Sequence, residues 1–393
     1  MPDRSFLDWP FFTDPHRQLA DKISNWARQS INSAPPINAD QKCRDLARAL
    51  GNKEWLRYLV PAAYGGISES VDVRTLCLIR ETLAYHSGLA EFVFAMQGLS
   101  SGPIALFGSD ELKKQYLSKI ASGDIIGAFA ISEAGAGSDL RAMQASARCE
   151  GDAYVVNGAK TWISNAGLAD LYVTFCKFPE KGDKSFLALA IPADFAGISI
   201  DRLEVVAPHP IGTIRFHNCR VPRSACVGEE GDGLKIALAT LDIFRSTVGA
   251  AALGFARRAL DEALAFAKDR RLFGHLLSDF QITQAKLAEM ALAIDASALL
   301  VYRAAWTRDV LKQQVTREAA MAKLHATESA QRIIDEAVQI LGGRGVLAGS
   351  ITEQLYREIR ALRIYEGTSE IQKLVIAKQV LKAAAGGQPG AQD

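Results

Sequence analysis

One carboxylate near the C-terminus, Glu366, lies in the stretch R-A-L-R-I-Y-E-G-T-S-E-I-Q, between an aromatic residue and a glycine. Tyr365 offers an apolar wall with a polar tip, and Gly367 leaves the backbone open to close approach by a ligand. Thr368 or Ser369 can cap the helix that follows. A carboxylate held in such a connection can reach a bound ligand. The simpler interpretation is an acid that stabilises the helix dipole, and this stretch alone does not decide between the two.

A second stretch of chemical interest, F-A-I-S-E-A-G-A-G-S-D, spans Phe129–Asp139. Gly135 and Gly137 expose backbone N–H groups beside the hydroxyls of Ser132 and Ser138, which suits an anionic or carbonyl-rich ligand. The stretch matches neither G-x-G-x-x-G nor the P-loop. A plain loop is therefore the alternative interpretation.

The stretch W-I-S-N places Trp162 and Ser164 two residues apart, so on a strand the two side chains share one face. An aromatic ligand could stack on the indole and accept a hydrogen bond from the hydroxyl. A tryptophan buried in the core is the alternative.

Two expected helix ends carry arginine and glycine. They are D-R-R-L-F-G at 269–274 and Q-I-L-G-G-R-G at 339–345. Arginine forks suit pyrophosphate. Helix C-termini also attract cations and often end in glycine, so ordinary caps explain both stretches without a ligand.

The composition is that of a soluble globular protein, with 49% hydrophobic and 23% charged residues in 393. This length allows two or three domains or one large composite. The formal net charge of +1 gives no general attraction to nucleic acid or anionic membranes. We find no apolar run that we expect to cross a bilayer.

The cysteines and histidines, six of each, are dispersed without a C-x-x-C pair, so we expect neither a metal site nor a disulfide scaffold. The N-terminal M-P-D-R-S-F-L-D-W-P has no apolar signal core and no transit-peptide character. These features predict a reduced, cytoplasmic protein.

The elements that must position these residues follow an α, then β, then α pattern. Helical spacing covers residues from about 14 to 125, with a helix capped by Asp14 and others over 39–50, 71–85, 88–107 and 110–123. From about 125 to 228 the period falls to two, which predicts an all-β insert, as a barrel or small sandwich. Within it, Asn157-Gly158 predicts a hairpin turn between 153–156 and 159–164.

Helical spacing returns at 233 and continues to about 385. We predict long helices over 234–270, 280–312 and 317–341, and a last pair flanking Glu366, the second beginning at Glu370. Short connections between long amphipathic helices describe an antiparallel four-helix bundle. The predicted domains of this α+β chain are 1–125, 126–228 and 229–385, followed by a disordered tail at 386–393.

Four separated motifs, A-G-A-G-S-D, W-I-S-N, R-x-x-F-G and Y-E-G-T-S-E-I-Q, together resemble the acyl-CoA dehydrogenase family of flavoproteins. The resemblance runs from the first helix to about Leu381, and the motifs follow the family's order. Each motif alone has an ordinary explanation, but four in the right order are not an accident.

The resemblance implies FAD bound between the β domain and the C-terminal bundle of a homotetramer built as a dimer of dimers. Its implied cofactor contacts are Phe129, Ile131, Ser132, Gly137, Ser138, Trp162, Ser164, Thr368 and Glu370, together with Arg270, Phe273, Gln281, Gln339 and Gly343 reaching FAD across the dimer interface. Its implied substrate contacts are Ser138, Tyr365 and Gly367, with Asp242 and Arg245 at the coenzyme A portion.

The implied reaction is α,β-dehydrogenation of an acyl-CoA thioester to the trans-2-enoyl-CoA. Glu366 would abstract the α-proton while its own N–H and a flavin ribityl hydroxyl polarise the thioester carbonyl, and the β-hydride would pass to flavin N5. Burial against the acyl group should raise the pKa of the carboxyl to suit a base. Electrons would then pass to an electron-transfer flavoprotein.

Departures from the family pattern also carry information. Some members place the base one residue before the arginine of the long bundle helix, where this chain has Phe244, which cannot accept a proton. Leu272 replaces the common Gln or Thr before F-G. The segment 201–216 lacks the usual Gly-x-Arg loop and is a few residues short, with an unusual His209 between prolines.

The sequence does not identify the acyl group of the substrate. By family analogy the helix from about 91 to 102 floors the acyl pocket, and Glu91 hints at a polar or short pocket, although we expect its side chain to face solvent. We predict a short or branched acyl group.

Three other functions on the same scaffold stay open. An acyl-CoA oxidase would use oxygen to reoxidise the flavin. A nucleic-acid-binding member is disfavoured by the neutral charge and the intact Glu366. A desulfinase-type or decarboxylating member would also pass through a thioester-stabilised carbanion.

Overall fold

The computed structural model describes residues 3–32, 34 and 37–386, which form two compact units. The first unit comprises 1–35, 72–91 and 242–393, and the second comprises 36–71 and 92–241. The division falls within two helices, α4 (Gly88–Phe107) and α6 (Gly233–Asp269), which continue from one unit into the other.

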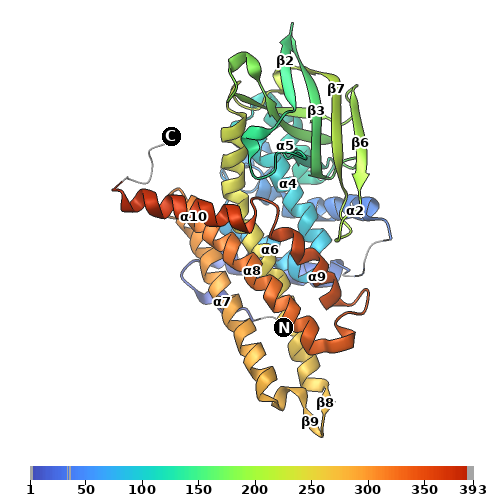
Figure 1. Cartoon of the computed structure of the whole chain (residues 1–393), viewed down its shortest axis with the longest axis vertical. Coiled ribbons are helices and arrows are strands. Elements are labelled where there is room, and N and C mark those ends of the chain that lie inside the picture. Colours follow the sequence, from blue (N-terminus) through green and yellow to red (C-terminus); the bar gives the residue numbers. More distant parts are fainter. Residues whose placement is uncertain (1–2, 33, 35–36, 387–393) are drawn as a thin grey trace. The chain divides into compact units, whose positions relative to one another are not determined.

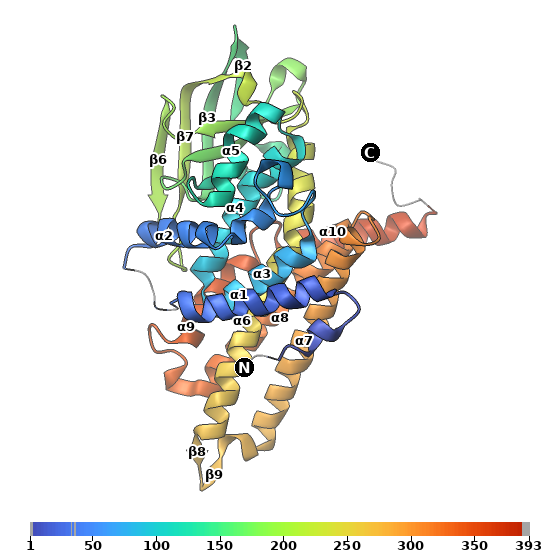
Figure 2. The same cartoon turned by 180° about the vertical axis from the view of Figure 1, so that it is seen from behind.

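The first unit is helical. Besides its part of α6, it contains α1 (Asp14–Ser30), α3 (Val73–His86), α7 (Gln281–Asp309), α8 (Thr316–Leu341), α9 (Ile351–Leu362) and α10 (Ser369–Ala384). Helix α7 lies along α8, which also packs against α9 and α10 (Figure 1). Helix α1 lies along α3, as the view from behind shows (Figure 2). The long helices predicted for the C-terminal part are confirmed.

Apolar spacing accounts for these contacts. Helix α3 buries Leu76, Ile79 and Leu83 on one face, and α8 buries Ala319, Ala326 and Ile334. Small residues on α8 let neighbouring helices approach closely. The predicted cap of α1 is wrong by one residue, since Thr13 is the N-cap and Asp14 is the first helical residue.

The second unit consists of a curled seven-stranded sheet with helices α2 (Ala39–Asn52) and α5 (Asp110–Ser122) and most of α4. Its strands run in the order β1-β4-β2-β3-β7-β6, and β5 also pairs with β4. Strands β1 and β4 are parallel, whereas β3 is antiparallel to both β2 and β7. Their bounds are β1 Gly127–Ala130, β2 Ser146–Glu150, β3 Ala153–Ser164, β4 Leu171–Lys177, β5 Phe186–Pro192, β6 Ile198–Leu203 and β7 Ile211–Pro222.

The hairpin predicted at Asn157-Gly158 is wrong. Both residues lie inside β3, where the pairing with β7 shifts register, so the glycine marks a β-bulge and not a chain reversal. Gly158 has a φ of 127°, and a Cβ there would come within 2.5 Å of the Cα of Ala145. The reversal occurs instead at Gly151, whose φ is 64°, between β2 and β3.

Two helices correct the expectation about apolar runs. By length and composition both α4 and α6 could cross a membrane. However, 78% of the most apolar window of α4 and 83% of that of α6 are buried inside the protein, which is typical of core helices.

The three predicted domain boundaries stay a prediction, because the two compact units divide the chain differently. The tail predicted to be disordered lies outside the described residues from 387 onward.

The β-bulge predicts that an alanine substitution lowers stability more at Gly158 than at Gly151. Replacing Gly158 with alanine adds strain and a clash with Ala145, so we expect the unfolding temperature to fall by roughly 5 °C. The matched control, Gly151→Ala, also has positive φ but meets no atom within 4 Å, so its decrease should be smaller. Equal decreases in thermal scans of the two variants would contradict the steric account.

Candidate active site

Glu366 sits in a strained turn between α9 and α10 of the first unit. Its φ of 54° lies in the left-handed region, which costs a residue with a side chain of order 1–3 kcal/mol. Gly367 follows with a φ of 92°, and a Cβ there would come within 2.5 Å of the Gln372 amide nitrogen. Thr368 then caps α10 by accepting a hydrogen bond from the N–H of Ile371. Of the two predicted caps, Thr368 is confirmed, and the helix begins at Ser369, one residue before Glu370.

Two fully buried side chains hold the backbone of this turn. The Nζ of Lys323 donates to the carbonyl of Gly367 at 2.7 Å. The Nε2 of Gln372 donates to the carbonyls of Glu366 and Gly367 at 3.1 and 3.0 Å. These hydrogen bonds fix the two carbonyls, so the turn keeps a strained backbone shape that it would otherwise lose.

The residues predicted to contact coenzyme A adjoin the same turn. The Nη1 of Arg245 donates to Asp242 Oδ1 at 2.7 Å, and its Nε lies 3.5 Å from the carbonyl of Glu366. The other oxygen of Asp242 accepts from the hydroxyl of Thr316. The first unit therefore brings together Glu366, Gly367, Asp242 and Arg245, while Tyr365 beside them leaves 37% of its surface exposed.

The carboxylate itself has an unusual environment. Among the described residues, Glu366 Oε2 is buried and has no hydrogen-bond partner. Desolvation raises the pKa of this carboxyl to about 7, against the opposing effect of the nearby cations Arg80, Lys323 and Arg245. A carboxyl with such a pKa is poised to accept a proton near neutral pH.

A buried ion pair supplies the first of these cations. Arg80 is 1% exposed and donates to the carboxylate of Glu91 and to the hydroxyl of Thr247, 2.6 Å away. The expectation that Glu91 faces solvent is wrong, because Glu91 is 3% exposed. A buried arginine requires a buried counter-charge, and Glu91 supplies it one turn into α4.

Lys323 is shifted in the opposite direction. Burial lowers its pKa to about 8, although the negative charge of Glu366 partly restores it. Glu366 is therefore a weaker acid, and Lys323 a weaker base, than an ordinary side chain of its type, and both lie at the same turn.

In the second unit, the glycine-rich stretch is shaped by a buried lysine. Lys160 of β3 donates to Glu133 at 2.7 Å and to the carbonyl of Ile131 at 3.0 Å. Glu133 in turn accepts from the backbone N–H groups of Gln144 and Ala145. One ion pair thus closes both ends of the 131–145 loop.

The predicted flavin contacts of this unit lie on and beside that loop. Gly137 and Ser138 are exposed, and Ile131 is buried. Trp162 of β3 has a φ of 61° and leaves 62% of its surface exposed, so the core alternative for this tryptophan is wrong. Ser164 is half-buried two residues on. Ser132 and Phe129, also half-buried, lie at the start of the stretch.

Five further predicted residues lie in the first unit, at the end of the bundle where α6 and α8 finish and α7 begins. Phe273 occupies the tip of a two-stranded ribbon, β8 (Arg271–Leu272) and β9 (His275–Leu276), and is 91% exposed. The ion pair between Lys286 and Glu336 ties the start of α7 to the end of α8. The other four, all exposed, are Arg270, Gln281, Gln339 and Gly343.

Two departures from the family pattern also have a place. Phe244 is 3% exposed, so the rival base position holds a buried aromatic ring. His209, in the short loop between β6 and β7, packs on the ring of Phe92 with centroids 4.3 Å apart.

Sequence reasoning missed the supporting residues Lys323, Arg80, Lys160 and Glu133. Lys323, Arg80 and Lys160 are charged residues within otherwise apolar helical or strand faces, and that pattern is the signal that could have found them. Glu133 lies in the loop after β1, inside the quoted 129–139 stretch, and its partner Lys160 is the signal for it. Gln372 was part of the quoted motif, but its side-chain role was not foreseen.

Comparison with known proteins agrees with the geometry. Three family models match in order: acyl-CoA dehydrogenase N-terminal domain at 13–124, middle domain at 128–219 and C-terminal domain at 231–381. The matches cover most of the chain.

Individual relatives have related descriptions. The chain is 44% identical over 287 residues to human mitochondrial short-chain specific acyl-CoA dehydrogenase, covering 72% of this chain and 69% of that one. It is 36% identical over 380 residues to a 3-(aryl)acrylate reductase of Clostridium sporogenes, covering 95% and 100%.

A solved structure described as the electron transferring flavoprotein of Acidaminococcus fermentans contains a similar chain. The TM-score is 0.88 at 32% identity, and the match covers 94% of this chain and 99% of that chain. The family models, the relatives and the arrangement of helices and curled sheet converge, and the chain belongs to the acyl-CoA dehydrogenase family of oxidoreductases.

Proposed function

We propose that this chain dehydrogenates an acyl-CoA thioester to the trans-2-enoyl-CoA, with Glu366 as the base that removes the α-proton. The observation that carries the proposal is the buried Glu366 Oε2, which has no hydrogen-bond partner among the described residues. A lone pair with no donor in its own protein is free to accept a proton from a ligand.

The surrounding residues adapt Glu366 to this task. A hydrogen α to a thioester carbonyl is weakly acidic, so the base must be matched in pKa and held in place. Desolvation raises the pKa of the Glu366 carboxyl to about 7, which suits a base that works near neutral pH. Lys323 and Gln372 hold the turn through its carbonyls. The N–H of Glu366 has no backbone acceptor among the described residues. That N–H is the candidate donor to the thioester oxygen, worth roughly 3–4 kcal/mol of barrier.

The residues of the second unit fit FAD. Gly135 and Gly137 have no atom within 4 Å of the position that a Cβ would take, so a ligand can approach the backbone closely. The exposed indole of Trp162 offers a flat surface for a ring system. We infer that Ser132, Ser138, Trp162 and Ser164 hold the flavin, which when bound supplies the acceptor for the β-hydride.

For the substrate, we infer that Arg245 and Asp242 contact the coenzyme A portion. Their ion pair is mostly buried, yet it lies against the turn that carries the base, so a bound thioester would pass both. The acyl group is proposed to be short or branched, which the likeness to a short-chain specific relative supports.

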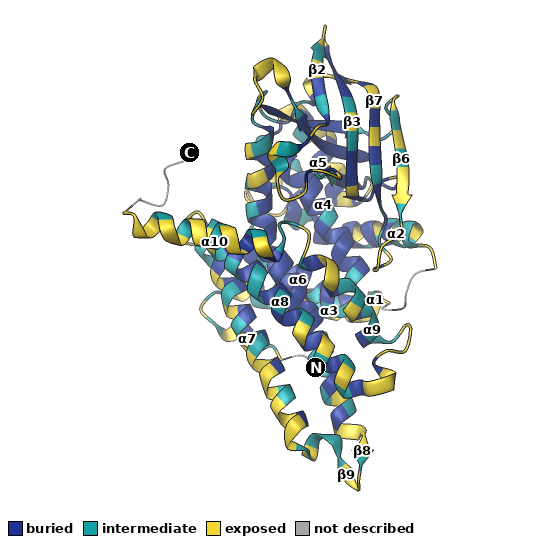
Figure 3. Ribbon diagram, viewed as in Figure 1, coloured by how far each residue is buried: buried dark blue, intermediate teal, exposed yellow. Residues whose placement is uncertain are grey.

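We also propose a homotetramer and an electron-transfer flavoprotein as electron acceptor. The assembly is supported by large apolar residues that are exposed on the bundle, among them Phe273, Ile282, Leu292 and Leu381 at 91, 76, 71 and 70% exposure. Figure 3 shows that exposed residues follow α7 and α10. The similar chain in the flavoprotein structure supports the acceptor. Consumption of oxygen by the substrate-reduced enzyme would favour the oxidase alternative instead. A cytoplasmic location stays a prediction.

Replacing Glu366 with glutamine should remove the base while keeping the shape of the turn. We expect normal flavin absorbance in the purified variant and a fall in the rate of flavin bleaching by acyl-CoA of about 100- to 10,000-fold. The matched control is Glu289→Gln, an exposed acid on α7, which should bleach normally. Normal anaerobic bleaching of the Glu366 variant by a panel of acyl-CoAs would exclude Glu366 as the base.

The raised pKa predicts the pH dependence of the reaction. Only the ionised carboxylate accepts a proton, so kcat/KM should be constant above pH 7 and fall by about tenfold per unit below it. An ordinary glutamate would place this limb near pH 4.5. Stopped-flow flavin reduction between pH 5 and 9 measures the limb, and a limb below about pH 5 would contradict the role of desolvation.

Lys323 should act on the base in two ways, through the hydrogen bond to Gly367 and through its charge. Lys323→Met removes both, so we expect slower reduction, by up to about 100-fold, and an acid limb moved to higher pH. Lys323→Arg keeps the charge and should keep the limb near its original pH. A methionine variant with an unchanged limb would leave Lys323 with a packing role alone.

A further inference from the structure

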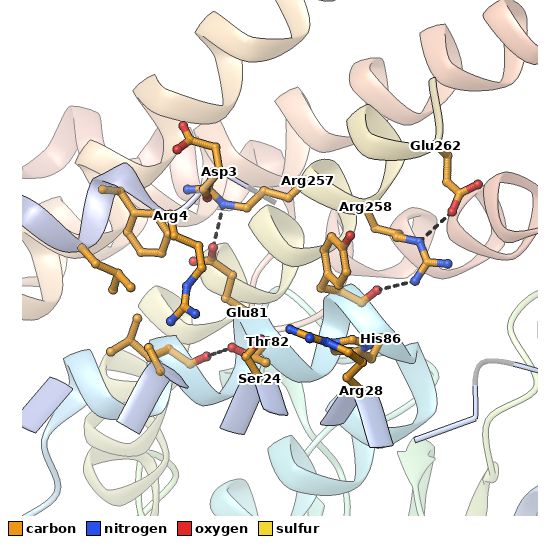
Figure 4. A pocket seen from close by; sticks show the side chains of 15 residues that line it. Asp3, Arg4, Ser24, Arg28, Glu81, Thr82, His86, Arg257, Arg258 and Glu262 are labelled. Atoms are coloured by element: carbon orange, nitrogen blue, oxygen red, sulfur yellow. Dashed lines mark hydrogen bonds and ion pairs between the residues drawn. The ribbon is translucent and has the colours of Figure 1, made fainter. Parts of the chain in front are cut away.

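A cavity of about 520 Å³ lies in the first unit, away from the residues of the predicted active site. It is lined by the N-terminal segment and by α1, α3 and α6 (Figure 4). Four arginines line it, namely Arg4, Arg28, Arg257 and Arg258. Such a volume is within the usual range of small-molecule sites.

Arg257 is the most deeply buried of these arginines, with 6% of its surface exposed. Its Nε donates to Glu81 at 2.7 Å, its Nη1 lies 3.4 Å from the carbonyl of Asp3, and its guanidinium stacks over Phe6. Its Nη2 is buried and has no acceptor among the described residues. A buried charged donor without an acceptor costs free energy, so an acceptor bound at this atom would be stabilised.

The acids around the cavity are already engaged. Glu81 accepts from Arg257 and from the hydroxyl of Tyr302, 2.5 Å away. Glu262 accepts from Arg258 at 2.9 Å. The carboxylate of Asp3 accepts from the backbone and side chain of Ser5. None of these carboxylates is directed at Arg257 Nη2, so an acceptor for it must come from elsewhere.

The other cations add to the positive side of the cavity. The side chain of Arg28 on α1 makes no hydrogen bond or ion pair with any residue that the structure describes, and it lies beside His86 at one edge (Figure 4). Burial and the neighbouring arginines lower the pKa of His86 to about 4, so its ring is neutral at pH 7 and can donate or accept. Arg258 also donates to the carbonyl of Tyr85.

Most of the remaining wall is apolar. Phe6, Leu7, Ala20 and Leu78 line it, together with the ring of Tyr85, and Ser24 and Thr82 add two hydroxyl side chains. A simple inorganic anion would leave this surface uncovered, whereas a ligand with an apolar body would bury it.

We propose that this cavity binds a small organic anion, with a phosphate or carboxylate head directed at the guanidinium of Arg257 and the side chain of Arg28, and an apolar body against Phe6 and Leu78. Arg257 offers the head group its unpaired Nη2, and the guanidinium of Arg28 can pair with either head group through two parallel hydrogen bonds. The site is separate from the Glu366 turn, and its occupation does not depend on the proposed dehydrogenation.

The test is calorimetric titration of the purified, flavin-loaded full-length protein with phenyl phosphate, benzoate, inorganic phosphate and phenol. We expect saturable binding of phenyl phosphate or benzoate and weaker binding of inorganic phosphate and phenol, because each of these lacks one half of the ligand. Comparing the two organic anions distinguishes a phosphate from a carboxylate head.

Matched variants then locate the binding. Arg28→Gln should weaken the preferred organic anion by about tenfold, the effect of one charge-assisted contact. Lys22→Gln removes the same charge from an exposed position on the same helix, outside the cavity, and should stay within about twofold.

Arg257→Lys keeps a charge beside Glu81 but loses the Nη2 donor, and it should weaken binding while the thermal unfolding temperature stays near that of the parent. The proposal is overturned if phenol binds as tightly as the anions, if no probe binds saturably, or if Arg28→Gln and Lys22→Gln bind alike.

Discussion

The first unit depends on keeping one carboxylate out of water without neutralising it. Glu366 loses solvation, and that loss raises its pKa to about 7. Burial alone would raise the pKa further. Arg80, Lys323 and Arg245 oppose it from different helices, and the outcome is a group that ionises near neutrality. None of the three donates a hydrogen bond to Oε2 among the described residues, so the positive charges act on the carboxylate while the lone pairs of Oε2 stay available.

Both units use the same device to shape a loop. Lys323 holds the turn at Glu366 through a backbone carbonyl, and Lys160 holds the 131–145 loop through the carbonyl of Ile131 and the carboxylate of Glu133. A buried lysine contributes little net stability, because desolvation offsets its attraction to its partners. Such a lysine does specify where its partners must lie. For a reactive group, a defined position matters more than a further small gain in stability.

The sequence carried the helices, the β insert and the motifs, because these depend on local spacing and residue type. Helices such as 88–107 were predicted at their observed ends. The errors arose where distant contacts decide. Asn157-Gly158 has the residues of a tight turn, but Ala145, which immediately precedes β2, leaves room only for a glycine there, and the strand continues. Glu91 seemed a surface acid, because nothing in its own helix reveals the buried Arg80 that it neutralises.

The order of segments along the chain bears on how the protein folds. The first unit is assembled from three stretches, and some of its contacts join residues far apart, such as Arg74 and Asp309, whose sequence separation is 235. The contacts of Glu366 with Arg245 likewise bridge 121 residues. Closing such long loops is slow, and during synthesis the N-terminal stretch must wait for residues beyond 242 before its partners exist. The second unit, complete by 241, can form while the first is still unfinished. The turn that carries the base is therefore among the last parts of the molecule to be built, and an interrupted synthesis would leave the sheet without it.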